Sequence, residues 1–291
     1  MNITRGVIQV PPRGVIYGPP GLGKTSWACG CEHPRRVAYA DVLLLSYEGG
    51  SNQIDFPESG PGGRVDGEGT WDASLRLVDG ACSGPGDWRS VVIDTADALE
   101  AQAIEAVCAR GKKASLADFA YGDGFEALLA RWRELLHALE GARAKGRAVW
   151  LVCHSTVRRH PDPMIGEHER IIPALAKKSW SATHQWADAV LFGNYEMGIV
   201  EKRPTLTGQR LLYTTAGSGF EAKNRWSLPS VMPLSRAGFE TAISSSSRTL
   251  DEVRASIRAL APAGPDIENY LTKTDDIRSL IATETALRKK G

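Results

Sequence analysis

A short glycine-rich segment constrains the fold of this chain more than any other feature of its sequence. It lies between a predicted buried strand at 14–17 and a helix that we expect to begin near Lys24, and it fits the pattern G-x-x-x-x-G-K-S/T. Its members are Gly18, Pro19, Pro20, Gly21, Leu22, Gly23, Lys24 and Thr25. Glycines at such positions let backbone N–H groups turn inward around phosphate oxygens. The pattern therefore predicts a nucleotide-binding loop.

The two last residues of this loop predict the cofactors. The ammonium group of Lys24 would contact the β- and γ-phosphates, and the hydroxyl of Thr25 would ligate Mg²⁺. We therefore expect ATP and Mg²⁺ to bind here, at the start of a helix whose N-terminal end favours anions.

Apolar runs alternate with helical patterns along most of the chain. Buried strands are expected at 14–17, 41–47, 90–94, 148–153 and 187–192, with helices at 96–110 and 125–143. This alternation predicts an α/β fold of the P-loop NTPase type, with a mostly parallel central sheet flanked by helices. A loop is expected at 57–70, with polar loops at 112–113 and directly after His154.

The pattern changes after residue 194. We expect a β-hairpin of 197–200 and 210–214 around a turn at 204–208, then a polar linker at 244–247. Helices are expected at 250–260 and 267–287. The predicted domains are an ATPase core at 1–235 and a linker with a helical C-terminal extension at 236–291.

Three polar residues follow predicted strands, at the sheet edge where ligands bind in open α/β folds. Asp94 is predicted to hold Mg²⁺ with Thr25, although a strand-ending aspartate can also serve as a helix N-cap. Glu48 is a candidate base for the attacking water, or a solvated loop acid. His154 could contact the γ-phosphate, or have a structural role.

The composition bounds the protein class. The 291 residues include 35 Lys and Arg against 34 Asp and Glu, so the net charge of +1 excludes a bulk-electrostatic nucleic-acid binder but not a local basic groove. No run approaches 18 apolar residues, so we expect no contact with a membrane. The five scattered cysteines predict reduced thiols and a cytoplasmic location.

The order of these strand-end residues resembles the RecA-type branch of P-loop ATPases. The sequence YEGG at 47–50 is similar to its catalytic-glutamate turn, and VIDT at 92–95 to its metal-binding strand. His154 takes the place of its γ-phosphate switch residue. The sequences YGD at 121–123 and AKNRWSLP at 222–229 resemble a bacteriophage family of minimal RecA-like proteins. That family includes AAA-type nucleotide-binding proteins and Sak-type single-strand annealing recombinases, and the resemblance covers about residues 10–232.

The resemblance implies a homo-oligomer, either a ring or a filament, in the cytoplasm of a bacterial host. Lys223 and Arg225 match the element with which RecA-type subunits reach the ATP of a neighbour, so the resemblance makes them catalytic in trans. The alternative is a surface hairpin whose cations are solvated.

The resemblance also implies that the segments 112–124 and 155–171 face single-stranded DNA. The second segment holds the predicted DNA-binding residues Arg158, Arg159, His160 and Arg170. Met164 is available to wedge between bases, and local positive charge would follow the phosphates. The alternative is a solvated loop in which neighbouring acids cancel part of this charge.

Three functions remain open from the sequence. The first is a DNA-stimulated, Mg²⁺-dependent ATPase of phage recombination or annealing, with a single-strand DNA-binding protein as a further candidate partner. The second is an AAA-type remodeller or helicase loader. The third is an oligomer that is gated by ATP binding without significant turnover.

Overall fold

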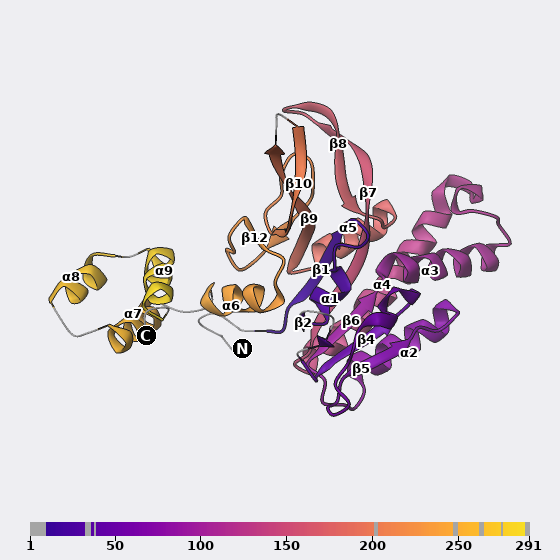
Figure 1. The fold of residues 1–291 in the computed structure, drawn as a ribbon. Helices are drawn as coiled ribbons and strands as arrows, with labels where there is room; N and C mark the ends of the chain where they lie inside the picture. Colours follow the sequence, from indigo (N-terminus) through magenta and orange to yellow (C-terminus); the bar gives the residue numbers. More distant parts are fainter. Residues whose placement is uncertain are drawn as a thin grey trace, which may run out of the picture. The chain divides into compact units, whose positions relative to one another are not determined.

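The structure is a computed structural model that describes residues 10–32, 36–37, 39–200, 203–246, 250–261, 265–274 and 276–288 (Figure 1). It contains two compact units, of which the first spans Val10–Gly238 and the second begins at Phe239. The candidate site lies in the first unit.

A twisted sheet forms the centre of the first unit. Its strand order is β12-β10-β9-β1-β7-β6-β4-β5, and the strands from β9 to β5 run parallel to one another. These are β9 (Ala189–Val200), β1 (Arg13–Gly18), β7 (Ala148–Asp162), β6 (Ser90–Asp94), β4 (Val42–Ser46) and β5 (Gly63–Asp66). The predicted α/β fold with a mostly parallel sheet is therefore confirmed.

Helices cover both faces of this sheet. They are α1 (Lys24–Ala28), α2 (Trp71–Ser83), α3 (Ala96–Gly111), α4 (Asp123–Ala144) and α5 (Lys177–Trp186). Successive residues of β7 pack on opposite faces of the sheet. Leu151 belongs to the apolar cluster that contains Trp132 of α4. Trp150 contacts Trp27 of α1, with ring centroids 4.9 Å apart. Burial on both faces explains the continuous apolar runs in the sequence.

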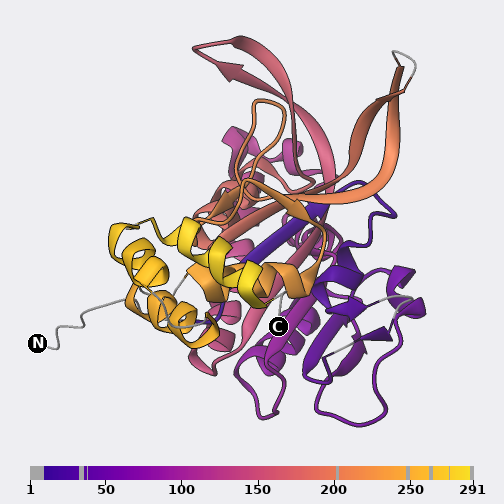
Figure 2. The ribbon, with the colours of Figure 1, turned by 60° about the vertical axis from the view of Figure 1, so that its left-hand side comes forward.

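Two long hairpins extend from the sheet, as Figure 2 shows. Strand β7 does not end before His154 as expected but continues to Asp162, and it pairs antiparallel with β8 (Gly166–Pro173). The expected loop at 155–171 is therefore wrong. Asp162 Oδ1 accepts the backbone N–H of Met164 at 2.8 Å and so stabilises the turn between the two strands. One face of this hairpin is exposed and the other is half-buried and mostly polar, so it lacks the apolar run that identified the other strands.

The second hairpin consists of β9 and β10 (Arg203–Tyr213) and is longer than predicted. The turn expected at 204–208 is wrong, because this stretch lies inside β10, where the pairing register shifts between Leu206 and Arg210. Gly208, with φ at 85°, supplies the left-handed residue at this irregularity. The connection at 201–202 lies outside the described residues.

Several further elements were not predicted. They are β2 (Cys31–Glu32), β3 (Arg36–Val37), β5 and α2 in or after the expected loop, β11 (Lys223–Asn224), β12 (Val231–Pro233) and α6 (Arg236–Ser246). The 3₁₀ turns at Gly49–Gln53, Leu116–Asp118 and Ala120–Gly122 complete the first unit.

The second unit contains helices from the predicted C-terminal extension. Helix α7 (Leu250–Leu260) is as predicted, but α8 (Pro265–Lys273) and α9 (Ile277–Arg288) replace the single helix expected at 267–287. Val253, Ile257, Leu271 and Leu280 form a small apolar core of their own. The amphipathic pattern thus indicated the helical state but not the break between two helices.

Candidate active site

The glycine-rich loop follows β1 directly, at the carboxyl edge of the parallel strands. Gly21 and Gly23 have φ values of 75° and 94°, which side-chain-bearing residues rarely adopt. Lys24 is buried, and its Nζ donates to the carbonyl oxygens of Gly18 at 3.1 Å and Pro19 at 3.0 Å. Burial lowers the pKa of this ammonium group, and the nearby Asp94 opposes that effect. The cation is thus held inside the loop, where it can exchange these carbonyls for phosphate oxygens.

Thr25 and Asp94 meet as the sequence predicted. The Thr25 hydroxyl donates to Asp94 Oδ1 at 3.1 Å, and Asp94 ends β6 with 3% of its surface exposed. Burial raises the pKa of this carboxyl to about 6, while the Thr25 hydrogen bond opposes that shift. A hydroxyl and a carboxylate side by side are the oxygen donors that Mg²⁺ prefers, so these residues fit the ion.

Glu48 and His154 lie together beside this pair. Glu48 Oε1 accepts the hydroxyl of Thr95 at 2.9 Å, and it lies 3.6 Å from His154 Nδ1. Both side chains are about a third exposed, at 38% and 34%, so each can reach a ligand. The register places His154 opposite Gly18, the first residue of the loop. The structure therefore brings four residues of the predicted site to one edge of the sheet: Thr25, Asp94, Glu48 and His154.

Asp97, in the first turn of α3, is a site residue that the sequence analysis missed. Its Oδ1 accepts the backbone N–H of His154 at 2.9 Å, and its Oδ2 lies 2.8 Å from His154 Nδ1. Because an ionised carboxylate can only accept, Nδ1 carries the proton and Nε2 remains for other partners. The spacing of three residues after Asp94, at the start of a helix, was the available signal.

The β9–β10 hairpin supplies two further missed residues. The Tyr195 hydroxyl donates to the carbonyl of Gly21 at 3.2 Å, and Arg210 Nη1 donates to the carbonyl of Leu22 at 3.1 Å. Their positions follow from the pairing of β9 and β10, which local patterns do not encode.

Lys223 and Arg225 lie at the opposite edge of the sheet. β11 pairs with the first residues of β9, so Lys223 is next to Val190. Its Nζ donates to the carbonyls of His184 at 2.7 Å and Ala187 at 2.8 Å, while Arg225 pairs with Asp188 at 3.1 Å. The structure therefore does not bring these cations to the phosphate loop of their own chain.

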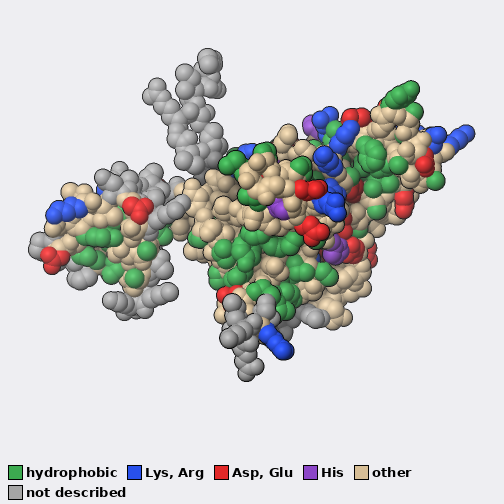
Figure 3. Space-filling view, turned by 90° about the horizontal axis from the view of Figure 1, so that it is seen from above, with side chains coloured by type: hydrophobic (Ala, Val, Ile, Leu, Met, Phe, Trp, Pro, Cys, Tyr) green, Lys and Arg blue, Asp and Glu red, His purple; other side chains and the backbone are tan. Residues whose placement is uncertain are grey.

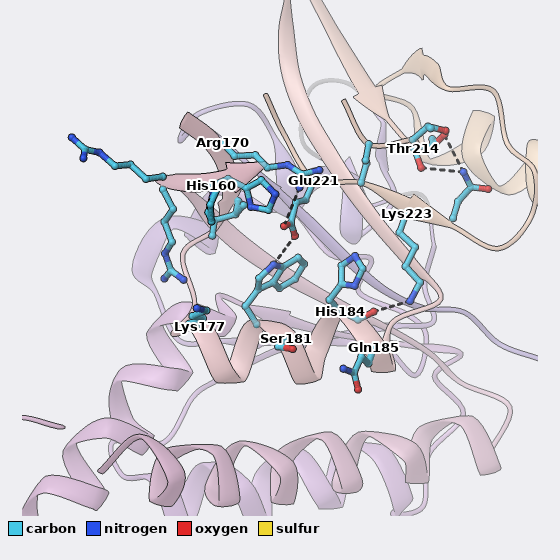
Figure 4. Close-up of a pocket in the computed structure, with 18 residues that line it drawn as sticks. His160, Arg170, Lys177, Ser181, His184, Gln185, Thr214, Glu221 and Lys223 are labelled. Atoms are coloured by element: carbon cyan, nitrogen blue, oxygen red, sulfur yellow. Dashed lines mark hydrogen bonds and ion pairs between the residues drawn. The ribbon is translucent and has the colours of Figure 1, made fainter. Parts of the chain in front are cut away.

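The four predicted DNA-binding residues line one cavity of about 940 Å³ between the β7–β8 hairpin, α5 and the segment 214–224 (Figure 4). Arg158 donates to the carbonyl of Leu175, and Arg170 donates to the carbonyl of Phe220 at 3.2 Å. Glu221 lies 3.7 Å from Arg170 and accepts from Trp180 Nε1 at 2.6 Å. We call this cavity the basic cleft, because the Arg and Lys side chains that line it outnumber its acidic side chain, Glu221. Figure 3 shows cationic side chains interspersed with acidic ones on the face that carries the hairpins.

A strand, a glycine-rich loop and a helix that present Lys24 and Thr25 beside a strand-ending aspartate define a P-loop nucleotide-binding site. The chain matches the family model described as AAA domain over residues 11–226, and it belongs to that family. This family is of the P-loop type, which binds and hydrolyses ATP with Mg²⁺. No curated protein matches the sequence. Among the described residues, no helix has the length and apolarity to cross a membrane.

Proposed function

We propose that this protein is an ATPase that acts on single-stranded DNA in phage recombination or annealing, as a homo-oligomer. The observation that carries the ATPase part is the Thr25–Asp94 hydrogen bond directly beside the Glu48–His154 pair. The DNA and phage parts rest on the RecA-like resemblance and on the basic cleft.

The chain's own residues suggest how hydrolysis proceeds. Lys24 exchanges the Gly18 and Pro19 carbonyls for phosphate oxygens, and the loop amides position the same groups. Thr25 and Asp94 would hold Mg²⁺, which would supply positive charge against the phosphates. Glu48 takes the proton of the attacking water, and Thr95 fixes the carboxylate for this task. His154 contacts a γ-phosphate oxygen as a donor through Nε2–H, which requires a proton on Nε2 in addition to the Nδ1 proton that Asp97 accepts.

The basic cleft supports the DNA proposal. Arg158, Arg159, His160 and Arg170 come from paired strands, so the hairpin holds them at fixed spacing rather than on a loose loop. Strand β7 carries both His154 and Arg158, which gives the nucleotide site a direct structural connection to the cleft.

Turnover with and without single-stranded DNA tests the proposal. We expect ATP hydrolysis with Mg²⁺ that rises when single-stranded DNA is added. Stimulation only by a protein client would favour a remodeller or helicase loader. Binding of ATP without turnover would favour a nucleotide-gated oligomer.

Salt dependence tests the cleft itself. Arg158→Ala/Arg159→Ala should weaken binding and flatten the slope of log affinity against log salt by about 1.4, at roughly 0.7 for each lost phosphate contact of a single strand. Arg110→Ala, which removes an exposed cation from α3, is the matched control. An unchanged slope in the double variant would exclude the cleft.

The trans role of Lys223 and Arg225 needs its own experiment. In an oligomer these side chains would exchange their carbonyl and Asp188 partners for the ATP of a neighbour. Lys223→Ala/Arg225→Ala protein should then bind ATP without hydrolysing it. Mixing it with Lys24→Ala protein should restore activity, once subunit exchange has been verified. Normal turnover by the double variant as a monomer would show that the cations act elsewhere.

A further inference from the structure

A second, smaller cavity of about 250 Å³ adjoins the phosphate-binding loop. Gly23 and Ser26 contribute to its wall, and these two residues flank Lys24 and Thr25. A triphosphate held on Lys24 and Thr25 therefore has this cavity next to one of its ends. The other lining residues are Trp27, Gly30, Cys31, Tyr39, Arg210, Leu234, Ser235, Arg236 and Ala237.

Flat side chains form two walls of this cavity. The ring of Tyr39 lies against the backbone of Gly30, where a Cβ atom would collide with it. The guanidinium of Arg236 lies over the rings of Trp27 and Trp150, with centroid distances of 5.1 and 4.8 Å. It also donates to the carbonyl of Ala28 at 3.1 Å, which fixes its plane. Aromatic and guanidinium planes are the groups on which nucleobases stack.

Arg210 closes the end of the cavity nearest the phosphate-binding loop. Its Nη1 lies 2.7 Å from the position that a Cβ of Gly23 would take, so a side chain at position 23 would displace the guanidinium. One of its N–H groups donates to the carbonyl of Leu22, and none of the carboxylates that the structure describes forms an ion pair with it. The cavity thus combines stacking surfaces with a cation at the phosphate end.

We propose that this cavity binds the nucleoside part of the nucleotide, with the base against Tyr39 and Arg236 and the Arg210 guanidinium toward the first phosphate. This inference rests on the proposed ATPase site and names the part of the ligand that the phosphate loop does not contact. The cavity, at about 250 Å³, is smaller than the roughly 300–1,000 Å³ of pockets for drug-sized molecules, so it would take the nucleoside part of the ligand and not the whole nucleotide.

Calorimetry with two probes, Mg-ATP and Mg-tripolyphosphate, separates the nucleoside site from the phosphate site. Tyr39→Ala should weaken ATP binding about 5- to 150-fold, the range for loss of one base–aromatic stack, and leave tripolyphosphate binding unchanged. Tyr39→Phe, which keeps the ring, should retain ATP affinity. Tyr121→Ala removes a fully exposed tyrosine and is the matched control for both probes.

Tryptophan fluorescence of the unmodified protein provides a second measurement that does not depend on how variants fold. Trp27, one of eight tryptophans, lines the cavity, so ATP should change the total tryptophan emission and tripolyphosphate should not. Equal responses to the two probes, or equal losses of both affinities in Tyr39→Ala, would overturn the nucleoside assignment alone. If the parent protein bound neither probe, the ATPase proposal would fail together with it.

Discussion

Replacement of Asp97 by asparagine tests whether the orientation of His154 matters for hydrolysis. The carboxylate accepts two hydrogen bonds from His154, one from the backbone N–H at 2.9 Å and one at Nδ1 at 2.8 Å. The two bonds go to different carboxylate oxygens, and in an amide one of these positions becomes an NH₂ donor, so in the same orientation asparagine accepts only one of them. Its NH₂ would donate to an unprotonated Nδ1, so His154 could no longer carry protons on both ring nitrogens, the form in which Nδ1 is held by residue 97 while Nε2 donates to the γ-phosphate.

The loss of one hydrogen bond to a charged group is worth about 1.5–3 kcal/mol, and each 1.4 kcal/mol is a factor of ten in an equilibrium. We therefore expect Asp97→Asn to reduce the population of correctly oriented imidazole, and with it steady-state phosphate release, by about one to two orders of magnitude. With ATP bound, nitrogen-15 NMR of the imidazole should show protons on both ring nitrogens in the parent and on Nε2 alone in the variant.

Asp123→Asn is the control for this experiment. Asp123 is also an aspartate in the first turn of a helix, α4, but it is exposed. It therefore matches the helix-dipole effect of Asp97 without a histidine partner among the described hydrogen bonds. If a folded Asp97→Asn protein hydrolysed ATP at the parental rate, the proposed role of Asp97 in orienting His154 would be refuted, even if the variant were less stable to heat.

Three further variants test other parts of the molecule. Lys24→Ala should abolish phosphate release, and undiminished release from a folded variant would remove the site assignment. Glu48→Gln should keep ATP affinity and slow single-turnover hydrolysis about 10²- to 10⁴-fold, which quenched-flow kinetics would measure; a parental rate would make Glu48 a loop acid. Asp188 is 4% exposed and pairs with Arg13, Arg143 and Arg225, which are partly exposed, so Asp188→Asn should lower the free energy of unfolding at pH 7 by about 1–3 kcal/mol in denaturant titrations. Burial would raise the pKa of Asp188, but the hydrogen bonds and charge of Arg13 outweigh it and hold the pKa below its usual range. This carboxylate therefore stabilises the fold above its unfolded pKa, and acid should reduce the stability of the parent more than that of the variant; equal acid sensitivity would contradict the ion-pair role.

The sequence predicted the parts of the site that depend on local signals. The phosphate-binding loop is encoded by a contiguous pattern, and Asp94 follows an unbroken apolar run, so local sequence was enough to place both at the sheet edge. The position of Glu48 was predicted in the same way, because it also comes directly after an apolar run. Because parallel strands bring their carboxyl ends to one edge, three separate strand ends were enough to predict one site.

The parts that were missed depend on pairings distant in the sequence. Arg210 reaches the phosphate-binding loop because β10 pairs with β9, which in turn pairs with β1. The β7–β8 hairpin has little apolar pattern, since one of its faces is exposed and the half-buried face carries mostly polar side chains. Its strands are therefore stabilised by mutual pairing rather than by a buried face, and apolar periodicity alone does not distinguish them from a loop.

The length of β7 bears on how the ATPase site and the basic cleft would communicate. The strand pairs in parallel with β1, and the last pair of that ladder is His154 opposite Gly18. From Ser155 onward, β7 pairs only with β8, in the antiparallel direction. His154 is thus the residue at which β7 leaves the rigid sheet, and Asp97 contacts both its backbone and its imidazole there. Arg158, four residues further along the same strand, lines the cleft. A change in the contacts of His154 would act at the base of the hairpin, where a small rotation moves every cleft residue on it together.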